Sequence, residues 1–424
     1  MGQQLVPLST FCTFTKGLSY QGAHLDKDGP ILMGIGTIKE GGGFRSQKLR
    51  TYNGPHKPEH RIHPGEVYVA MTNMAEETRR FLGSTARLPD INGEYGILTH
   101  HVSKVNWKTD ESIMQDFLYW VMRSHAFHQH CRNHGIGTTV YSVKGKDAEK
   151  FLVPAALNDE LRTLTQLLND LEQQEQSILQ VQAGLKTMIQ ALYRSWFVDF
   201  DPVLAKVAGN APPGMDAETG QLFPESIEES KNGKVPTGWR YVFLEDLATL
   251  TKTTLNPKSR PDERFLHYSI PAFDDGEKPD LSFGDEIESN KFIVPEHCVL
   301  LSKLNPKWNR VWLPTPSDEV VQIASTEFLP WVPKAGVSLY FLYSMMISQP
   351  FRWQMDSRIS GTTGSHQRVR PDDCAKIPCL MPSREVMTTF HEKVEVLFEQ
   401  LRFLSGKLTD IRTIKEAQIQ RLLS

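Results

Sequence analysis

The sequence has few cysteines and no long apolar run, and both features narrow the class of protein. Only five of its 424 residues are cysteines, and they are scattered along the chain. Their spacing matches no disulfide framework, which indicates a reducing compartment. No apolar run approaches the ~20 residues needed to span a membrane. The N-terminus also lacks the basic, apolar and cleavage-site arrangement of a signal peptide. The sequence therefore predicts a cytoplasmic protein that makes no contact with a membrane.

Motifs for catalysis are also missing from the sequence. It contains no Walker A motif, no glycine-rich cofactor loop after a clear strand and no convincing carboxylate cluster of a nuclease. The Asn/Asp-Pro-Pro-aromatic tetrapeptide of adenine methyltransferases is not supplied by Asp201-Pro202-Val203 or by Asn210-Ala211-Pro212-Pro213. We therefore expect a protein that is not itself an enzyme and that carries no cofactor and no metal.

Proline is absent between Ala155 and Asp201, and this stretch has the pattern of one long helix. Positions spaced alternately by four and three are apolar at ten of twelve places, and the exceptions are Glu175 and Gln182. A 3.5-residue repeat of this length predicts a coiled-coil seam. About forty helical residues make a rod of roughly 60 Å. The seam positions are Leu157, Leu161, Leu164, Leu168, Leu171, Glu175, Ile178, Gln182, Leu185, Ile189, Leu192 and Trp196.

Residues 384–424 carry a second seam of the same kind, from Met387 to Leu422, in which Lys415 and Gln418 are the polar exceptions. Two unrelated amphipathic helices, each packed on its own domain, would explain both seams. The chain returns between them over about 180 residues, so an antiparallel pair of helices within one molecule is the better interpretation.

The chain contains an internal sequence repeat. Phe117-Leu118-Tyr119, the segment Ile136–Thr139 and Val153-Pro154 each have a similar segment 224 residues later, in the same order. Upstream, Gly34–Ile38 resembles Ser269–Phe273 at an offset of 235. The prediction is an α+β protein with two pseudo-symmetric globular domains separated by two long antiparallel coiled-coil helices. The expected boundaries are 1–154 (domain), 155–200 (helix), 201–235 (exposed linker), 236–380 (domain) and 381–424 (helix).

Strands are expected at Gly65–Met71 and Cys298–Ser302, and helical segments at Asp116–Cys131 and Ser338–Met355. The first helical segment resembles a metal site, because His130 and His134 lie on one helix face. At the 224 offset, however, no usual zinc ligand replaces the histidines. The repeated fold therefore does not require a metal there.

Two locally basic stretches stand out in a chain whose net charge is −3. Phe44–His63 and Ser302–Trp312 combine lysine and arginine with asparagine and aromatic residues, a composition suited to phosphate and base contacts. We place them in corresponding regions of the two halves. Solvated basic loops would give the same pattern. The candidate DNA-contacting residues are Arg45, Lys48, Arg50, Asn53, Lys57, Arg61, Lys303, Asn305, Lys307, Asn309 and Arg310.

The Gly-Thr-Thr segment of the second half is followed by a histidine and arginines, which suit phosphate binding. A structural turn that leads into the long helix explains glycine and threonine equally well. The further candidates are Thr362, Thr363, His366 and Arg368.

Several phrases of the sequence resemble the specificity subunits of type I restriction-modification enzymes. They are LYRSWFVDFDP (Leu192–Pro202), GMDAETGQLFPES (Gly214–Ser226), VPTGW (Val235–Trp239) and SGTTGSHQRV (Ser360–Val369). The resemblance covers essentially the whole chain. One departure is that the first half lacks the Pro-x-Gly-Trp phrase that opens the second, so its leading strand is expected to be shortened or divergent.

The resemblance implies a reader of double-stranded DNA whose two target-recognition domains each recognise one half of a split, asymmetric site. It implies two methyltransferase (modification) subunits that methylate adenine and restriction/translocase subunits that cut unmethylated DNA, as in prokaryotic phage defence. S-adenosylmethionine, ATP and Mg²⁺ would be bound by those partners. Partner docking is assigned to Leu192, Tyr193, Trp196 and Phe197, because large aromatics at a helix end are either core or interface anchors. The alternative is a coiled-coil adaptor that does not bind DNA.

Overall fold

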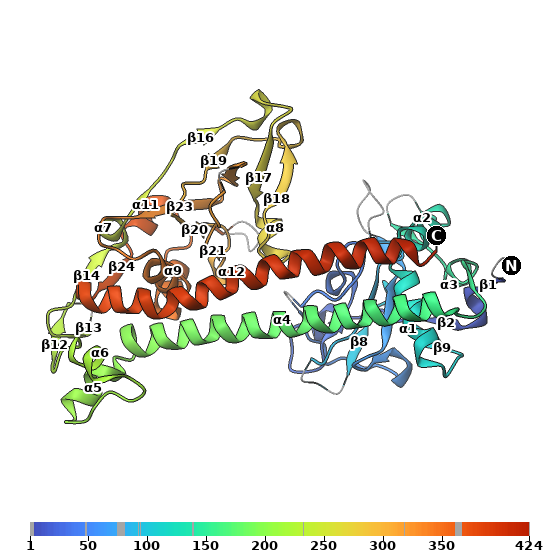
Figure 1. Ribbon diagram of the computed structural model, residues 1–424, viewed down its shortest axis with the longest axis horizontal. Helices are drawn as coiled ribbons and strands as arrows, with labels where there is room; N and C mark the ends of the chain where they lie inside the picture. Colours follow the sequence, from blue (N-terminus) through green and yellow to red (C-terminus); the bar gives the residue numbers. More distant parts are fainter. Residues whose placement is uncertain are drawn as a thin grey trace. The chain divides into compact units, whose positions relative to one another are not determined.

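The structure is a computed structural model, and it describes residues 4–46, 49–73, 81–91, 93, 95–137, 140–231, 233–317, 319–360 and 367–423. The chain divides into two compact units. Unit 1 comprises Met1–Ile178 and Lys407–Ser424, and unit 2 comprises Leu179–Gly406. Each unit contains a mixed α+β globular part and a segment of each of the two long helices, so the expected α+β class is confirmed (Figure 1).

Unit 1 is built on two small sheets. The main sheet is antiparallel, in the order β2 (Cys12–Lys16), β9 (Val102–Trp107), β5 (Val67–Ala70) and β7 (Thr85–Arg87). The second has the order β3 (Leu32–Met33), β8 (Gly96–Leu98) and β4 (Arg61–Ile62), with β3 and β8 parallel. Two separate strand pairs complete unit 1. They are β1 (Leu5–Pro7) with β11 (Leu152–Pro154) and β6 (Thr72–Asn73) with β10 (Tyr141–Ser142). Its helices are α1 (Ser112–Met122), α2 (His125–Asn133) and α3 (Gly145–Ala148).

Unit 2 repeats this plan. Its antiparallel sheet has the order β15 (Ala248–Leu250), β23 (Phe328–Pro333), β20 (Val299–Ser302) and β21 (Val311–Trp312). The second sheet has the order β16 (Thr254–Leu255), β19 (Lys291–Ile293), β22 (Val321–Ala324), β17 (Arg264–Tyr268) and β18 (Asp280–Phe283). The strand β14 (Arg240–Phe243) pairs with β24 (Pro378–Met381). Its helices are α7 (Leu244–Leu247), α8 (Ile270–Asp274), α9 (Leu339–Ile347), α10 (Gln349–Asp356) and α11 (Pro371–Ala375).

The strand orders show that the two globular parts share one topology. Strands β2, β9, β5 and β7 match β15, β23, β20 and β21, and the parallel pair β3–β8 matches the parallel pair β17–β22. Each helical segment breaks at a serine, Ser124 or Ser348, and these two residues are 224 positions apart. The sequence repeat is therefore a structural repeat. The leading strand of the first half pairs as that of the second does, β1 with β11 and β14 with β24, and it is one residue shorter.

The long helices are α4 (Asp159–Phe197) and α12 (Arg384–Arg421), and each contributes to both units. In unit 1, Leu161 and Leu168 of α4 share a core with Ile419 of α12. In unit 2, the opposite ends of the helices meet, and Ile189 lies in one core with Phe390. This is the antiparallel pairing expected from the two seams. Within the described ranges, no helix is both long enough and apolar enough to cross a membrane.

The stretch expected to be an exposed linker carries regular structure. It contains α5 (Asp201–Val207), α6 (Ala217–Gln221), β12 (Ile227–Ser230) and β13 (Gly233–Pro236). The side chains of Val203 and Phe223 are buried in the core of unit 2, where Phe223 lies edge-on to Trp196 at 4.9 Å. A few apolar side chains thus hold a Pro/Gly-rich segment against the domain.

Candidate nucleic-acid interface

The first basic stretch connects β3 to β4 in unit 1, and part of its charge is already compensated. The Arg50 guanidinium donates two hydrogen bonds to the Asp26 carboxylate, at 3.0 and 2.8 Å. The hydrogen bond from Arg50 lowers the pKa of Asp26. Asn53 lies in the same stretch, and its side-chain oxygen is 3.2 Å from a His24 ring nitrogen. An approaching phosphate would compete with Asp26 for Arg50, so Arg50 is a weaker candidate than its charge suggests.

Among the other described cations of this stretch, Lys57 presents its charge to solvent and Arg61 is half-buried. Lys57 is 74% exposed, 3.6 Å from the Glu59 carboxylate. The Arg61 guanidinium lies over the Tyr95 ring at 4.5 Å, a cation–π arrangement that holds its plane in place. Arg45 is half-buried. Lys48 lies outside the described residues. Lys57 and Arg61 are therefore the cations of this loop best placed to meet a phosphate.

The second basic stretch connects β20 to β21 in unit 2, and two of its predicted contacts are structural instead. The Arg310 side chain is 4% exposed and donates to both carboxylate oxygens of Asp274 on α8, at 2.8 and 3.0 Å. Asn309 has a left-handed backbone (φ 45°), and its side-chain amide donates to the Ile347 carbonyl at 3.0 Å. Both residues hold the loop in place, so neither is available to DNA in this conformation. The sequence suggested otherwise because Asp274 lies 36 residues upstream.

The remaining residues of this loop form its tip. Asn305 adopts a left-handed backbone (φ 47°) and its N–H donates to the Gln367 carbonyl at 2.7 Å, so its backbone closes the turn. Lys303 is half-buried, and its backbone pairs with Glu327 and Val369. Lys307 is exposed, and its ammonium lies 5.4 Å from the centre of the Trp308 ring. The tip therefore presents one cation and one aromatic ring.

The two basic stretches do not occupy corresponding places in the repeat, contrary to our expectation. The first runs from β3 to β4, whose counterparts are β17 and β19, whereas the second follows β20, the counterpart of β5. The counterpart of the second stretch in unit 1 lies after β5, around residues 74–80, which are outside the described residues. The sequence offset between the halves changes from 235 to 224 along the repeat. Because of this change, the sequence did not show that the two basic stretches join different strands.

The residues that flank the two Gly-Thr-Thr segments are paired in the same way. Ile136 forms a bridge with Ser142 in unit 1, and Ser360 forms one with Arg368 in unit 2. The Arg368 guanidinium also pairs with Glu327 at 2.9 Å, and its side chain is 41% exposed. Thr362, Thr363 and His366 lie outside the described residues. The same pairing in both halves favours the structural interpretation for these flanking residues.

Unit 2 also exposes two tryptophans, of which Trp353 was missed from sequence. Trp353 on α10 is 62% exposed and Trp308 is 45% exposed, and the turn that carries Trp308 packs against α10. Arg352 and Lys307 are exposed beside them. We call these four residues the tryptophan patch. The helical periodicity of α10 would have indicated that Trp353 is exposed. Phe351 and Met355 face the core, so Trp353 lies on the opposite face of the helix.

The helix-end aromatics are core residues rather than docking residues. Tyr193, Trp196 and Phe197 are at most 4% exposed, and Leu192 packs against the same cluster. Phe390 and Phe341 cover them, with ring centroids about 5–6 Å from Phe197 or Tyr193. A partner protein therefore cannot touch these three aromatic side chains without opening unit 2.

Other apolar side chains of the helices are exposed. Val181 and Met188 of α4 are 47% and 58% exposed, and Val396 and Phe403 of α12 are 63% and 61% exposed. Each pair is separated by one heptad, so each forms a short stripe along its helix. A groove of 940 Å³, lined by α6 and the start of α12 and including Val396, mixes acidic side chains with Arg384, Lys393 and threonines. Exposed stripes of this kind mark protein-binding surfaces.

The histidine segment of α2 serves the fold. Burial and the charge of Arg132 lower the pKa of His128 to about 4. The His130 Nε2 atom is 2.8 Å from the Asp147 carbonyl oxygen, and Cys131 is fully buried. Across the residues that the structure describes, no three His, Cys, Asp or Glu side chains are grouped as metal ligands.

Comparisons with known proteins agree with the resemblance found in the sequence, although no protein-family model matches the chain. The chain is 24% identical over 294 residues to the type I restriction enzyme HindI specificity subunit of Haemophilus influenzae, covering 58% of this chain and 62% of that relative. It thus spans less than two thirds of that relative's length. Identity to the MjaIX specificity subunit of Methanocaldococcus jannaschii is 18% over 323 residues, covering 74% and 69% of the two chains.

A solved structure supports the fold. The crystal structure of a type I restriction-modification S subunit from M. genitalium superposes with a TM-score of 0.53 at 11% sequence identity, covering 100% of this chain and 96% of that one. The predicted resemblance to type I specificity subunits is confirmed by the two relatives, and the fold class by this structure.

Proposed function

We propose that this chain is the specificity subunit of a type I restriction-modification complex. It binds a bipartite, asymmetric DNA site and directs adenine methylation or cleavage by its partner subunits in a prokaryotic cytoplasm. The observation that carries the proposal is the duplicated α+β domain, because two copies of one fold with different loops suit two different half-sequences. The chain itself catalyses nothing in this proposal.

The DNA-contacting surface of unit 1 is assigned to the β3–β4 loop, with Lys57 and Arg61 as its leading phosphate contacts. Lys48 belongs to the same loop and remains a candidate. Lysine and arginine on a loop position the domain through phosphates without reading sequence. Base reading is left to neighbouring side chains such as Asn53, whose amide has the donor and acceptor that adenine requires.

The surface of unit 2 is assigned to the tryptophan patch and, from the sequence, to Thr362, Thr363 and His366. Methylation requires that the target adenine leave the base stack. An exposed tryptophan can stack on bases or fill the space of a displaced one, while Lys307 and Arg352 neutralise phosphates. Lys303, Asn305 and Arg368 shape this surface through backbone and ion-pair contacts.

We assign the docking surfaces for the partner subunits to the long helices. Two methyltransferase subunits that bind S-adenosylmethionine would dock on the exposed stripes Val181–Met188 and Val396–Phe403, which together offer apolar anchors. Restriction/translocase subunits that use ATP and Mg²⁺ would join this assembly.

The decisive experiment maps adenine methylation in a host genome that expresses this chain with its neighbouring methyltransferase. A single split motif is expected. Exchange of residues 236–380 for those of another specificity subunit should change one half of the motif and leave the other half intact. The absence of any motif, with an active and bound methyltransferase, would indicate a coiled-coil adaptor instead.

A further inference from the structure

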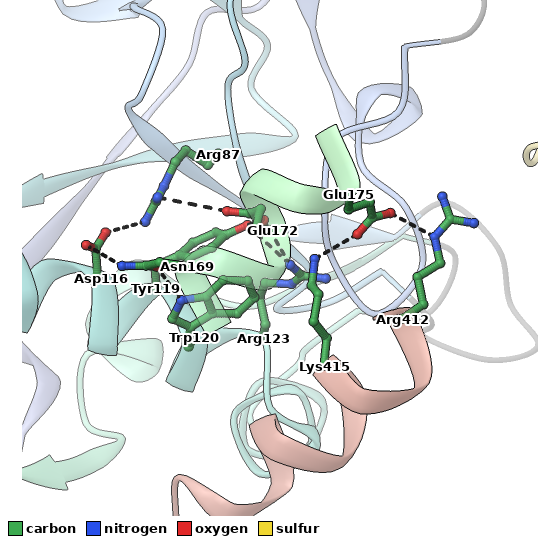
Figure 2. Close-up of polar contacts among 10 residues, drawn as sticks. All are labelled: Arg87, Asp116, Tyr119, Trp120, Arg123, Asn169, Glu172, Glu175, Arg412 and Lys415. Carbon is green, nitrogen blue, oxygen red and sulfur yellow. Dashed lines mark hydrogen bonds and ion pairs between the residues drawn. The ribbon is translucent and has the colours of Figure 1, made fainter. Parts of the chain in front are cut away.

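The seam between the long helices contains a buried ion pair in unit 1. The Glu175 carboxylate of α4 accepts a hydrogen bond from the Lys415 ammonium of α12 at 2.8 Å and another from the Arg412 guanidinium at 2.7 Å (Figure 2). The Glu175 and Lys415 side chains are only 10% and 6% exposed. One polar interruption of each heptad pattern, Glu175 and Lys415, therefore faces the other.

The ion pair is linked to the globular part of unit 1. The Lys415 ammonium lies 5.4 Å from the centre of the Trp120 ring, and the Trp120 indole donates to Asn169 at 2.8 Å. Glu172 accepts from the Tyr119 hydroxyl at 3.0 Å and pairs with Arg123 at 3.4 Å. Figure 2 shows these side chains converging from α1, α4 and α12. One polar cluster thus joins the globular part to both long helices.

The leucines around the pair would allow more than one alignment of the helices. Shifting α12 by one heptad along α4 would place Glu175 opposite Leu408 or Leu422 and Lys415 opposite Leu168 or Gln182, while most leucines near the pair in unit 1 would still meet apolar residues. The shift would leave a carboxylate buried without its cation, which is strongly unfavourable. A single buried polar position is a known means of specifying one register in a coiled coil.

We propose that the Glu175–Lys415 pair fixes the register of α12 on α4 and thereby sets the gap between the two halves of the recognised DNA site. The gap follows from the register because each globular domain continues directly into one of the two helices. This second part rests on the proposed function, whereas the register itself is a property of the chain alone. Glu175 and Lys415 are positioning residues.

The test replaces both charges with leucine in the full-length chain. Leucine continues the apolar seam, and replacing a buried ion pair by apolar residues generally preserves stability. The matched control is Glu160→Leu with Arg421→Leu, which removes an exposed pair between the same two helices, 3.8 Å apart. A third variant reverses the pair, with Glu175→Lys and Lys415→Glu.

Register is measured by pulsed electron paramagnetic resonance with spin labels at Gln166→Cys and Thr413→Cys. Both positions are exposed, and all five native cysteines are buried, so the labels stay on the new sites. The parent, the control and the reversed variant should each give one distance. The Glu175→Leu/Lys415→Leu variant should add a second population displaced by one heptad, about 10 Å along the helix. A single unshifted distance in that variant would overturn the proposal.

The gap is measured by adenine methylation in the same host. The leucine variant should methylate both the parental motif and a motif with a changed gap but unchanged half-sequences. If the leucine variant gives two label distances but methylates only the motif with the parental gap, the register does not set the gap, and that part of the proposal is overturned. Two label distances in a chain whose parent yields no motif would support the register role and contradict the proposed function.

Discussion

At the scale of single residues, charge pairing decides which basic side chains face a ligand. Arg310 and Lys307 lie three residues apart in one loop, yet Asp274 holds the first inside unit 2 while the second is exposed. A sequence shows the loop's own composition but not the acid that folds back onto it. Residue identity thus marked the loop as basic but did not reveal that two of its members, Asn309 and Arg310, pair inward.

Replacing Arg310 by alanine should lower the free energy of unfolding of unit 2 by about 3 kcal/mol, because Asp274 would be left without its cation. Chemical denaturation of the full chain measures this change. Lys307→Ala is the matched control, and its cost should stay within about 0.5 kcal/mol because the side chain is exposed. Equal stability of the two variants would show that the Asp274 pair is unimportant.

The stability of unit 1 should depend on pH through Glu175. Burial opposes ionisation of this carboxylate, but the charge of Lys415 and hydrogen bonds from Lys415 and Arg412 outweigh it and lower the pKa to about 2. Arg123 and Glu172 also face the cluster and act on Lys415. A depressed folded-state pKa stabilises the fold above the unfolded-state value, and this contribution is lost as pH falls toward 2.

The measurement compares the parent with Glu175→Gln by denaturation between pH 7 and pH 2.5. Near pH 7 the parent should exceed the variant by about 3 kcal/mol, a figure that follows from the size of the pKa shift. The difference should be constant above pH ~5 and shrink below it. A constant difference over the whole range would contradict the role of the ionised carboxylate.

At the scale of elements, the long helices were the most predictable part of the fold. The heptad pattern gave their pairing and direction, because a continuous apolar stripe must be covered by another. The aromatic end of α4 was ambiguous, since periodicity does not say what covers a helix. In unit 2, Tyr340 of α9 stacks on Phe398 of α12 at 4.3 Å, and Phe341 and Phe390 close over Tyr193 and Phe197.

Inserting one heptad into both α4 and α12, after Ile178 and before Lys407, should preserve the seam and lengthen the rod by about 10 Å. The proposed function then predicts a gap longer by about three base pairs, at ~3.4 Å per base pair, with both half-sequences unchanged. Methylation mapping provides the readout. Altered half-sequences with an unaltered gap would contradict the spacer role of the helices.

Changing Phe403 to glutamate should weaken methyltransferase binding at least about tenfold, or about 1.4 kcal/mol, because a charge replaces an exposed apolar anchor. Affinity is measured with purified subunits. Gln400→Glu adds the same charge at an exposed site one turn away and should have little effect. Since both sites are exposed, thermal stability should not change in either variant. Equal affinity of the two variants would move the docking surface elsewhere.

At the scale of the whole molecule, the repeat was visible in sequence only where the offset was constant. The segments at 224 residues lie in α1, between α2 and β10, and in β11, close to the helix that follows. Upstream, insertions between strands shift the offset, so the two basic loops were matched to each other although they join different strands. Strand order, which no short sequence match reveals, was needed to align the halves correctly.

The pairing of β1 with β11 and of β14 with β24 has a consequence for how such chains diversify. Each globular domain begins and ends on two neighbouring strands, so its entry and exit points lie next to each other. A crossover between genes at those two points would transplant one whole domain without disturbing the helices or the other domain. If the proposed function holds, new combinations of half-sequences would then arise by shuffling intact modules, with no intermediate that must evolve a fresh fold.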